Sequence, residues 1–145
     1  MNQIAIFYPV FVQALLTIAI GGMMALARAR AIATMDRQRG NPDLALGRVV
    51  WPEDAAKRAA SFSNQFELPV LFYAVVAFAL IAKGADLIML VLAWAFVLTR
   101  IVHAGIHIGP NKVRWRSMAF AAGCVIILLM WVKLFLHVVT RGIVV

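Results

Sequence analysis

The sequence predicts an all-α integral membrane protein, a single membrane domain built as a bundle of four transmembrane helices. Of its 145 residues, 64% are hydrophobic and only 14% are charged, whereas a soluble domain is about 45–50% apolar and about 25% charged. The mean hydropathy is +0.92, which excludes a soluble globular protein and also excludes disorder. The single cysteine excludes a disulfide framework.

Four stretches are apolar enough to form helices of about 20 residues, the length that crosses a membrane. We place the spans at about residues 4–27, 60–82, 87–108 and 117–138, with loops at 28–59 and 109–116. No basic residue precedes the first span, so we expect a retained helix and not a signal peptide. Pro52 and the two acids after it predict the start of a helix that runs straight into the second span.

The second and third spans are short unless they carry charges into the membrane. The uncharged stretches Leu68–Ala82 and Leu87–Thr99 are only about 22 Å and about 20 Å long at 1.5 Å per residue. Glu67 and Arg100 then lie at similar depth on neighbouring helices. Because an unpaired charge in a membrane is costly, we expect either a structural ion pair between them or a ligand site that uses both.

Small or polar residues recur at helical spacing in the first span, and polar residues do so in the second and third, where contact with lipid would be costly. They are Gln13, Thr17, Gly21, Met24 and Arg28 in the first span, Ser61, Asn64 and Glu67 in the second, and Arg100, His103, His107 and Arg114 in the third if its helix continues through Gly109 and Pro110. We expect the three faces to converge on a site for a small molecule with two carboxylates and an amine, or for an anionic headgroup. The two histidines have no evident third ligand, so we expect no metal.

The basic residues predict the orientation in the membrane. The first and third loops hold ten of the fourteen Lys and Arg residues, whereas the second loop holds only Lys83 and Asp86. The positive-inside rule places the two basic loops in the cytoplasm and both termini outside. In so apolar a chain, a net charge of +8 indicates this asymmetry and not nucleic-acid binding.

Three short motifs resemble the family of membrane-associated proteins in eicosanoid and glutathione metabolism (MAPEG). The segment from Asn64 to Glu67 resembles the family's N-x-x-E motif. The segment from Arg100 to His107 resembles its R-x-x-H-x-x-x-Y motif, as in the branch of microsomal prostaglandin E synthase and microsomal glutathione transferase. Arg116-Ser117 resembles the pair that opens the fourth helix in that branch. The resemblance covers nearly the whole chain.

The resemblance implies a homotrimer that binds glutathione as a cosubstrate between neighbouring subunits, near the cytoplasmic face. Asn64 and Glu67 would hold polar groups of the peptide, and Arg100, His103 and His107 would line the site. The remaining implied residues are Arg28 or Arg30 for a carboxylate or the thiol, Arg116 for the thiolate with Arg114 as its rival, and Ser117 in an assisting role.

Three positions depart from the family pattern. Ala60 stands where the family usually has an arginine, Leu68 where a tyrosine often follows the glutamate, and His107 where the third-span motif ends in tyrosine. The first hypothesis is a membrane-bound glutathione-dependent transferase or peroxidase that acts on lipophilic electrophiles or hydroperoxides. The alternative is a non-catalytic relative that binds lipid or a protein partner in the same cleft. A transporter or channel is disfavoured because the four spans show no internal repeat.

Overall fold

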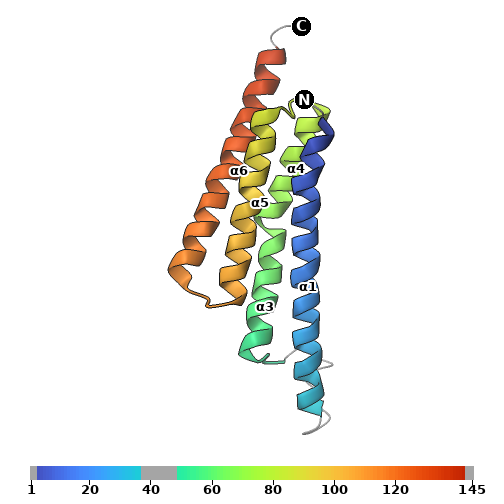
Figure 1. The fold of residues 1–145 in the computed structure, drawn as a ribbon, viewed down its shortest axis with the longest axis vertical. Helices are drawn as coiled ribbons and strands as arrows, with labels where there is room; N and C mark the ends of the chain where they lie inside the picture. The colour runs from blue at the N-terminus through green and yellow to red at the C-terminus, as the bar shows by residue number, and fades with distance from the viewer. Residues whose placement is uncertain (1–2, 37–48, 143–145) are drawn as a thin grey trace.

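The fold is an elongated bundle of helices that run roughly parallel to one long axis (Figure 1). It is seen in a computed structural model that describes residues 3–36 and 49–142. The elements within these residues are η1 (Gln3–Ile6), α1 (Phe7–Asp36), α3 (Glu53–Ser63), η2 (Asn64–Phe66), α4 (Leu68–Ile81), α5 (Leu87–Ile108) and α6 (Val113–Gly142).

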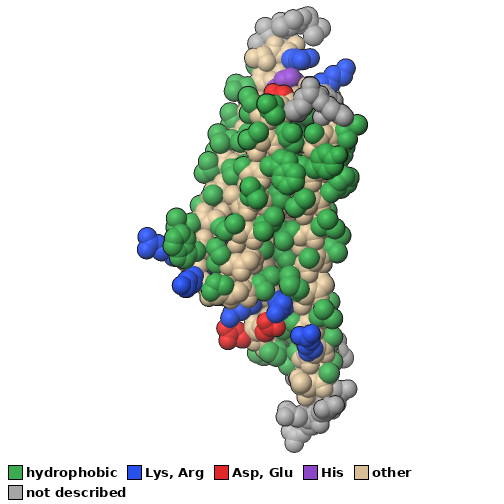
Figure 2. Space-filling model, in the orientation of Figure 1, with side chains coloured by type: hydrophobic (Ala, Val, Ile, Leu, Met, Phe, Trp, Pro, Cys, Tyr) green, Lys and Arg blue, Asp and Glu red, His purple; other side chains and the backbone are tan. Residues whose placement is uncertain are grey.

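Four helical segments among the described residues are long and apolar enough to cross a membrane. They are Ile4–Met35, Glu53–Ile81, Leu87–Ile108 and Val113–Arg141. Apolar side chains cover the middle of the visible face, and charged side chains gather towards its two ends (Figure 2). The predicted fold class, an all-α bundle with four membrane-spanning helices, is confirmed.

The bundle has two chemically different ends. We call one the basic end; it holds the last turns of α1, the start of α3 and the turn between α5 and α6 (Figure 1). The opposite end, which we call the turn end, holds the turn between α4 and α5, the start of α1 and the end of α6.

The second membrane-spanning segment is broken in its middle. Its helix starts at Glu53, directly after Pro52, as predicted, but the prediction of an unbroken helix is wrong. The chain tightens into η2, and Glu67 then adopts φ −92° and ψ −100°, outside the helical range. Pro69, in the first turn of α4, has no N–H to continue the hydrogen-bond ladder of α3.

A buried polar contact fastens this break to the first helix. Gln13 Nε2 on α1 donates a hydrogen bond to Gln65 Oε1 in η2 at 3.0 Å. Gln65 Nε2 in turn donates to the carbonyl oxygen of Ser61 at 3.4 Å. This hydrogen bond explains why the apolar first span carries a polar residue, Gln13, at this position.

The apolar core lies between α4, α5 and α6 and is extended by Ile6 of η1. Phe72 of α4 and Phe96 of α5 are fully buried and stack with ring centroids 4.8 Å apart. Met130 of α6 and Met89 of α5 are fully buried in the same cluster. Such packing between α5 and its neighbours holds the polar residues of α5 at fixed positions relative to α3 and α6.

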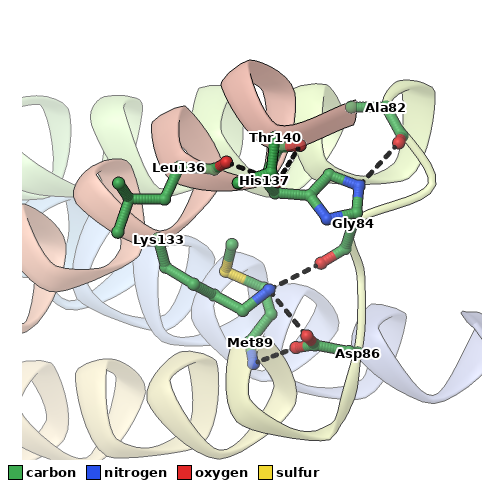
Figure 3. Close-up of polar contacts among 8 residues, drawn as sticks. All are labelled: Ala82, Gly84, Asp86, Met89, Lys133, Leu136, His137 and Thr140. Atoms are coloured by element: carbon green, nitrogen blue, oxygen red, sulfur yellow. Dashed lines mark hydrogen bonds and ion pairs between the residues drawn. The ribbon is translucent and has the colours of Figure 1, made fainter. Parts of the chain in front are cut away.

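At the turn end, α6 holds the turn between α4 and α5 through polar side chains (Figure 3). Lys133 Nζ lies 2.8 Å from Asp86 Oδ2 and donates to the carbonyl oxygen of Gly84 at 3.0 Å. His137 Nε2 donates to the carbonyl oxygen of Ala82 at 3.0 Å, while Asp86 Oδ1 accepts from the Met89 amide. The His137 contact satisfies the carbonyl of Ala82 at the end of α4, and the Asp86 contact satisfies a free amide at the start of α5.

Candidate functional site

A polar cavity of about 380 Å³ opens between α3, η2, α5 and α6, towards the basic end. Its volume falls in the range of about 300–1,000 Å³ that is typical of small-molecule sites. Its lining combines two imidazoles, a guanidinium, an amide and a hydroxyl with two apolar side chains. The lining residues are Ala60, Asn64, His103, His107, Arg116, Ser117 and Phe120.

The two histidines of α5 form one wall of this cavity. They lie one helical turn apart, and their rings are parallel within 1°, with centroids 5.8 Å apart. Each residue is only 5% exposed. Asn64 Nδ2 lies 3.4 Å from His107 Nδ1. Because an amide N–H can only donate, His107 Nδ1 is the acceptor and the neutral ring carries its proton on Nε2.

Arg116 enters the cavity from the first turns of α6. Its Nη1 donates a hydrogen bond to Asn111 Oδ1 at 2.9 Å. Asn111 lies in the turn between α5 and α6 with φ 47°, a backbone conformation that asparagine tolerates better than most residues. Ser117 follows on the same helix and also lines the cavity. Arg114, the rival for the role of Arg116, is exposed and does not line it.

The separation of Arg114 from the histidines has a simple cause. The sequence placed Arg114 on their face only if the third helix continued through Gly109 and Pro110. The helix instead ends at Ile108, and Arg114 belongs to α6, which starts at Val113 in a new direction. The third helix therefore does not carry Arg114 onto the face that holds the histidines.

Arg100 lies behind the cavity and not in its lining. Its side chain is 2% exposed, and its Nη2 donates to the carbonyl oxygens of Ala119 and Phe120 on α6 at 3.1 and 3.5 Å. The guanidinium also lies over the rings of Phe96 and Phe120, 5.5 and 5.4 Å from their centroids. Arg100 Nε is buried without a hydrogen-bond partner.

The ion pair, one of the two arrangements expected for Glu67 and Arg100, does not form among the described residues. Equal depth along two helices does not place two side chains on facing sides. The break after η2 leaves Glu67 exposed, while Arg100 turns towards the backbone of α6. Glu67 also does not line the cavity, although Asn64 does.

The two predicted arginines of the first span lie elsewhere in the single chain. Arg28 lies over the ring of Trp51, 4.9 Å from its centroid. Arg30 lines a separate cavity between α1 and α3. Neither side chain reaches the cavity that holds Arg116.

Sequence reasoning missed Asn111 and Phe120. Phe120 is four residues after Arg116 on one helix, so the helical repeat could have placed it on the same face. No sequence signal singled out Asn111. Among the described residues, no three of the types His, Cys, Asp and Glu gather as a metal site.

Comparison with known proteins identifies the family. A sequence profile of the MAPEG family matches residues 6–136, which is most of the chain. No curated protein and no solved structure matched the chain in the same comparisons. Together with the four apolar helices, the profile match makes the chain an integral, multi-pass membrane protein. The chain belongs to the MAPEG family.

Proposed function

We propose that this chain is a membrane-bound glutathione-dependent transferase or peroxidase that acts on lipophilic electrophiles or hydroperoxides. Its motifs resemble those of the branch of microsomal prostaglandin E synthase and microsomal glutathione transferase. The observation that carries the proposal is that Arg116, Ser117 and Asn64 line one cavity together with both histidines. Three separate sequence motifs thus contribute to a single polar site.

The donors of this cavity suit glutathione, a tripeptide with two carboxylates, an amine and a thiol. The Arg116 guanidinium can bind a carboxylate or a thiolate through charge-assisted hydrogen bonds. The Asn64 amide and the Ser117 hydroxyl can each donate to or accept from peptide groups. Bound glutathione would supply the thiol that becomes the nucleophile.

In this proposal, Arg116 favours the thiolate over the thiol. The guanidinium carries a permanent positive charge, whereas an ordinary thiol has a pKa near 8.5. Each unit by which the pKa falls requires only about 1.4 kcal/mol of preference for the anion. Asn111 engages one Nη1 hydrogen of Arg116 and leaves its other N–H donors for the sulfur, while Ser117 supports the same position.

In this proposal, the second substrate enters from the membrane, and neighbouring subunits in the membrane complete the site. We propose a homotrimer whose basic loops lie in the cytoplasm and whose termini lie outside. A neighbouring subunit would then bring Arg28 or Arg30 to the cavity, which neither reaches within its own chain. Exposed apolar side chains on every long helix leave the site surrounded by lipid, from which a lipophilic molecule can enter.

One observation favours the second candidate, a non-catalytic relative that binds lipid or a protein partner in the same cleft. Ala60 lines the cavity where the family pattern has an arginine. Arg116 is therefore the one guanidinium among the lining residues of the described chain, which weakens the recognition of a peptide with two carboxylates.

Calorimetric titration of the detergent-purified protein with glutathione tests the proposal. Asn64→Leu keeps the size of the side chain but removes its hydrogen bonds, and we expect the affinity to fall by about tenfold or more. Ser63→Ala, next to it but exposed and outside the cavity lining, should bind as the wild type does. Absence of saturable binding to the wild type would overturn the proposal. Binding without turnover of an aryl halide or a hydroperoxide would favour the second candidate.

A further inference from the structure

A second, smaller cavity lies between α1 and α3 at the basic end. Its volume is about 170 Å³, and it is lined by Met23, Leu26, Ala27, Arg30 and Arg58. We call it the Arg30–Arg58 cavity. Within one chain, none of these residues lines the cavity that holds Arg116. Arg58 has no part in the proposed glutathione chemistry, whereas Arg30 is one of the two arginines that a neighbouring subunit would bring to that cavity.

The two arginines of this cavity retain free hydrogen-bond donors. Arg58 Nε donates to both carboxylate oxygens of Asp54, at 3.1 and 3.0 Å, and no described residue accepts from its Nη atoms. Within the described residues, the Arg30 side chain has no hydrogen bond or ion pair. Two cations and one carboxylate leave a net positive charge and open guanidinium groups, an arrangement that suits an oxyanion such as a phosphate.

The position of this cavity along α1 corresponds to a membrane surface. Ala27 is the last residue of the stretch Ile4–Ala27, which carries no charged side chain. One residue further on, Arg28 lies over the ring of Trp51, and tryptophan is enriched at the level of the lipid headgroups. Met23 and Leu26 therefore lie on the apolar side of this level, and Arg30 lies on its polar side.

We propose that the Arg30–Arg58 cavity binds the phosphate of an anionic phospholipid. Arg30 and Arg58 hold the phosphate oxygens, and the first part of an acyl chain lies against Met23 and Leu26. Basic pockets between transmembrane helices are known to bind anionic headgroups. The apolar side chains of Met23 and Leu26 favour a lipid over free phosphate, because only a lipid has an acyl chain that can pack against them.

Native mass spectrometry of the full chain, released from detergent, tests this proposal. The probes are phosphatidylglycerol and phosphatidylcholine with identical acyl chains. Arg30→Gln and Arg58→Gln should each lower the affinity for phosphatidylglycerol by about fivefold and leave phosphatidylcholine unchanged. Arg114→Gln is the matched control, because Arg114 is an exposed arginine at the same end and lies outside this cavity. Asp54→Asn should raise the affinity, since it removes the competing carboxylate.

Two outcomes would overturn the proposal. Equal losses in Arg30→Gln, Arg58→Gln and Arg114→Gln would mean that the anionic lipid is held by the diffuse positive charge of this end. Displacement of phosphatidylglycerol by millimolar inorganic phosphate would make the ligand a free phosphate and not a lipid. Glutathione binding should be unchanged in Arg58→Gln, so a failure here is separable from a failure of the proposed function.

Discussion

Arg116 Nη1 donates a hydrogen bond to Asn111 Oδ1 at 2.9 Å across the start of α6. Asn111 is fixed in the preceding turn by its positive φ of 47° and by its backbone amide, which donates to the carbonyl oxygen of Ile106 at 2.8 Å. The turn thus holds the guanidinium before any ligand arrives. Preorganised charge of this kind is the means by which a protein stabilises an anion without reorganising.

Adding a second guanidinium to the cavity should strengthen glutathione binding. Ala60 is exposed and lines the cavity one helical turn before Asn64. We expect Ala60→Arg to raise the affinity by about tenfold, since a hydrogen bond to a charged group contributes about 1.5–3 kcal/mol. Ala56→Arg, one turn earlier, exposed and outside the lining, is the control. Equal gains in both variants, measured by calorimetry, would indicate only a general effect of charge.

A larger residue at position 123 should destabilise the bundle. A Cβ at Gly123 would meet the guanidinium of Arg100 and, at 3.1 Å, the hydroxyl of Thr99. Because that guanidinium is buried and bonded to α6, it has little room to move. We expect Gly123→Ala to lower the free energy of unfolding by about 1–3 kcal/mol, as overpacking typically does.

Gly22→Ala is the control for that substitution. A Cβ at Gly22 meets nothing within 4 Å, and alanine is favoured over glycine inside a helix by about 0.5–1 kcal/mol. Thermal unfolding in detergent should therefore show opposite signs for the two variants. A neutral Gly123→Ala would mean that Arg100 is not fixed where we place it.

The sequence predicted the four helices because hydropathy over about 20 residues reflects membrane thickness directly. It also named Asn64, His103, His107, Arg116 and Ser117, all of which line one cavity. Motif order can select residues of one site without knowledge of the helix packing.

The expected pairing of Glu67 with Arg100 depended on how the two helices are rotated about their axes, which residue spacing does not give. The depths of Glu67 and Arg100 follow from residue counts, but their rotation about the helix axes does not. Pro69 breaks the second span and turns Glu67 outwards. The carbonyl oxygens that accept hydrogen bonds from Arg100 belong to the backbone of α6. Every residue has a backbone carbonyl, so the sequence does not show which of them accepts.

The buried amide pair should show strong coupling between α1 and the break in the second span. Gln13→Leu alone leaves Gln65 without its partner, and we expect a loss of about 1–3 kcal/mol in the free energy of unfolding. The double variant Gln13→Leu, Gln65→Leu replaces both groups and should lose less than the sum of the two single variants. Strictly additive losses in a double-mutant cycle would contradict the pairing.

The ion pair at the turn end should make stability depend on acidic pH. Burial alone would raise the pKa of Asp86, but hydrogen bonds from Lys133 and the Met89 amide, together with the Lys133 charge, outweigh it and hold the pKa below its usual range. A carboxyl with a lowered pKa in the folded state stabilises the fold above its unfolded pKa of about 3.9 and loses that contribution as pH falls through the folded value.

Asp86→Asn tests this pH dependence, because asparagine still caps a helix but cannot pair with Lys133. At neutral pH the variant should unfold at a lower temperature, with a loss of at most about 1 kcal/mol. The difference from the wild type should shrink as pH falls below the unfolded pKa of about 3.9, and it should vanish once pH lies below the lowered pKa of the native carboxyl. A difference that stays constant from neutral to strongly acidic pH would rule out the ion pair as its cause.

The central claim is that Arg116 stabilises a glutathione thiolate, and the ultraviolet absorbance of the thiolate in the detergent-purified protein measures it most directly. We predict a saturable thiolate signal in the wild type that Arg116→Ala abolishes. Arg114→Ala removes the same charge two residues away, outside the cavity, and should retain the signal. A thiolate signal that survives in Arg116→Ala, or one that is lost equally in both variants, would contradict the account.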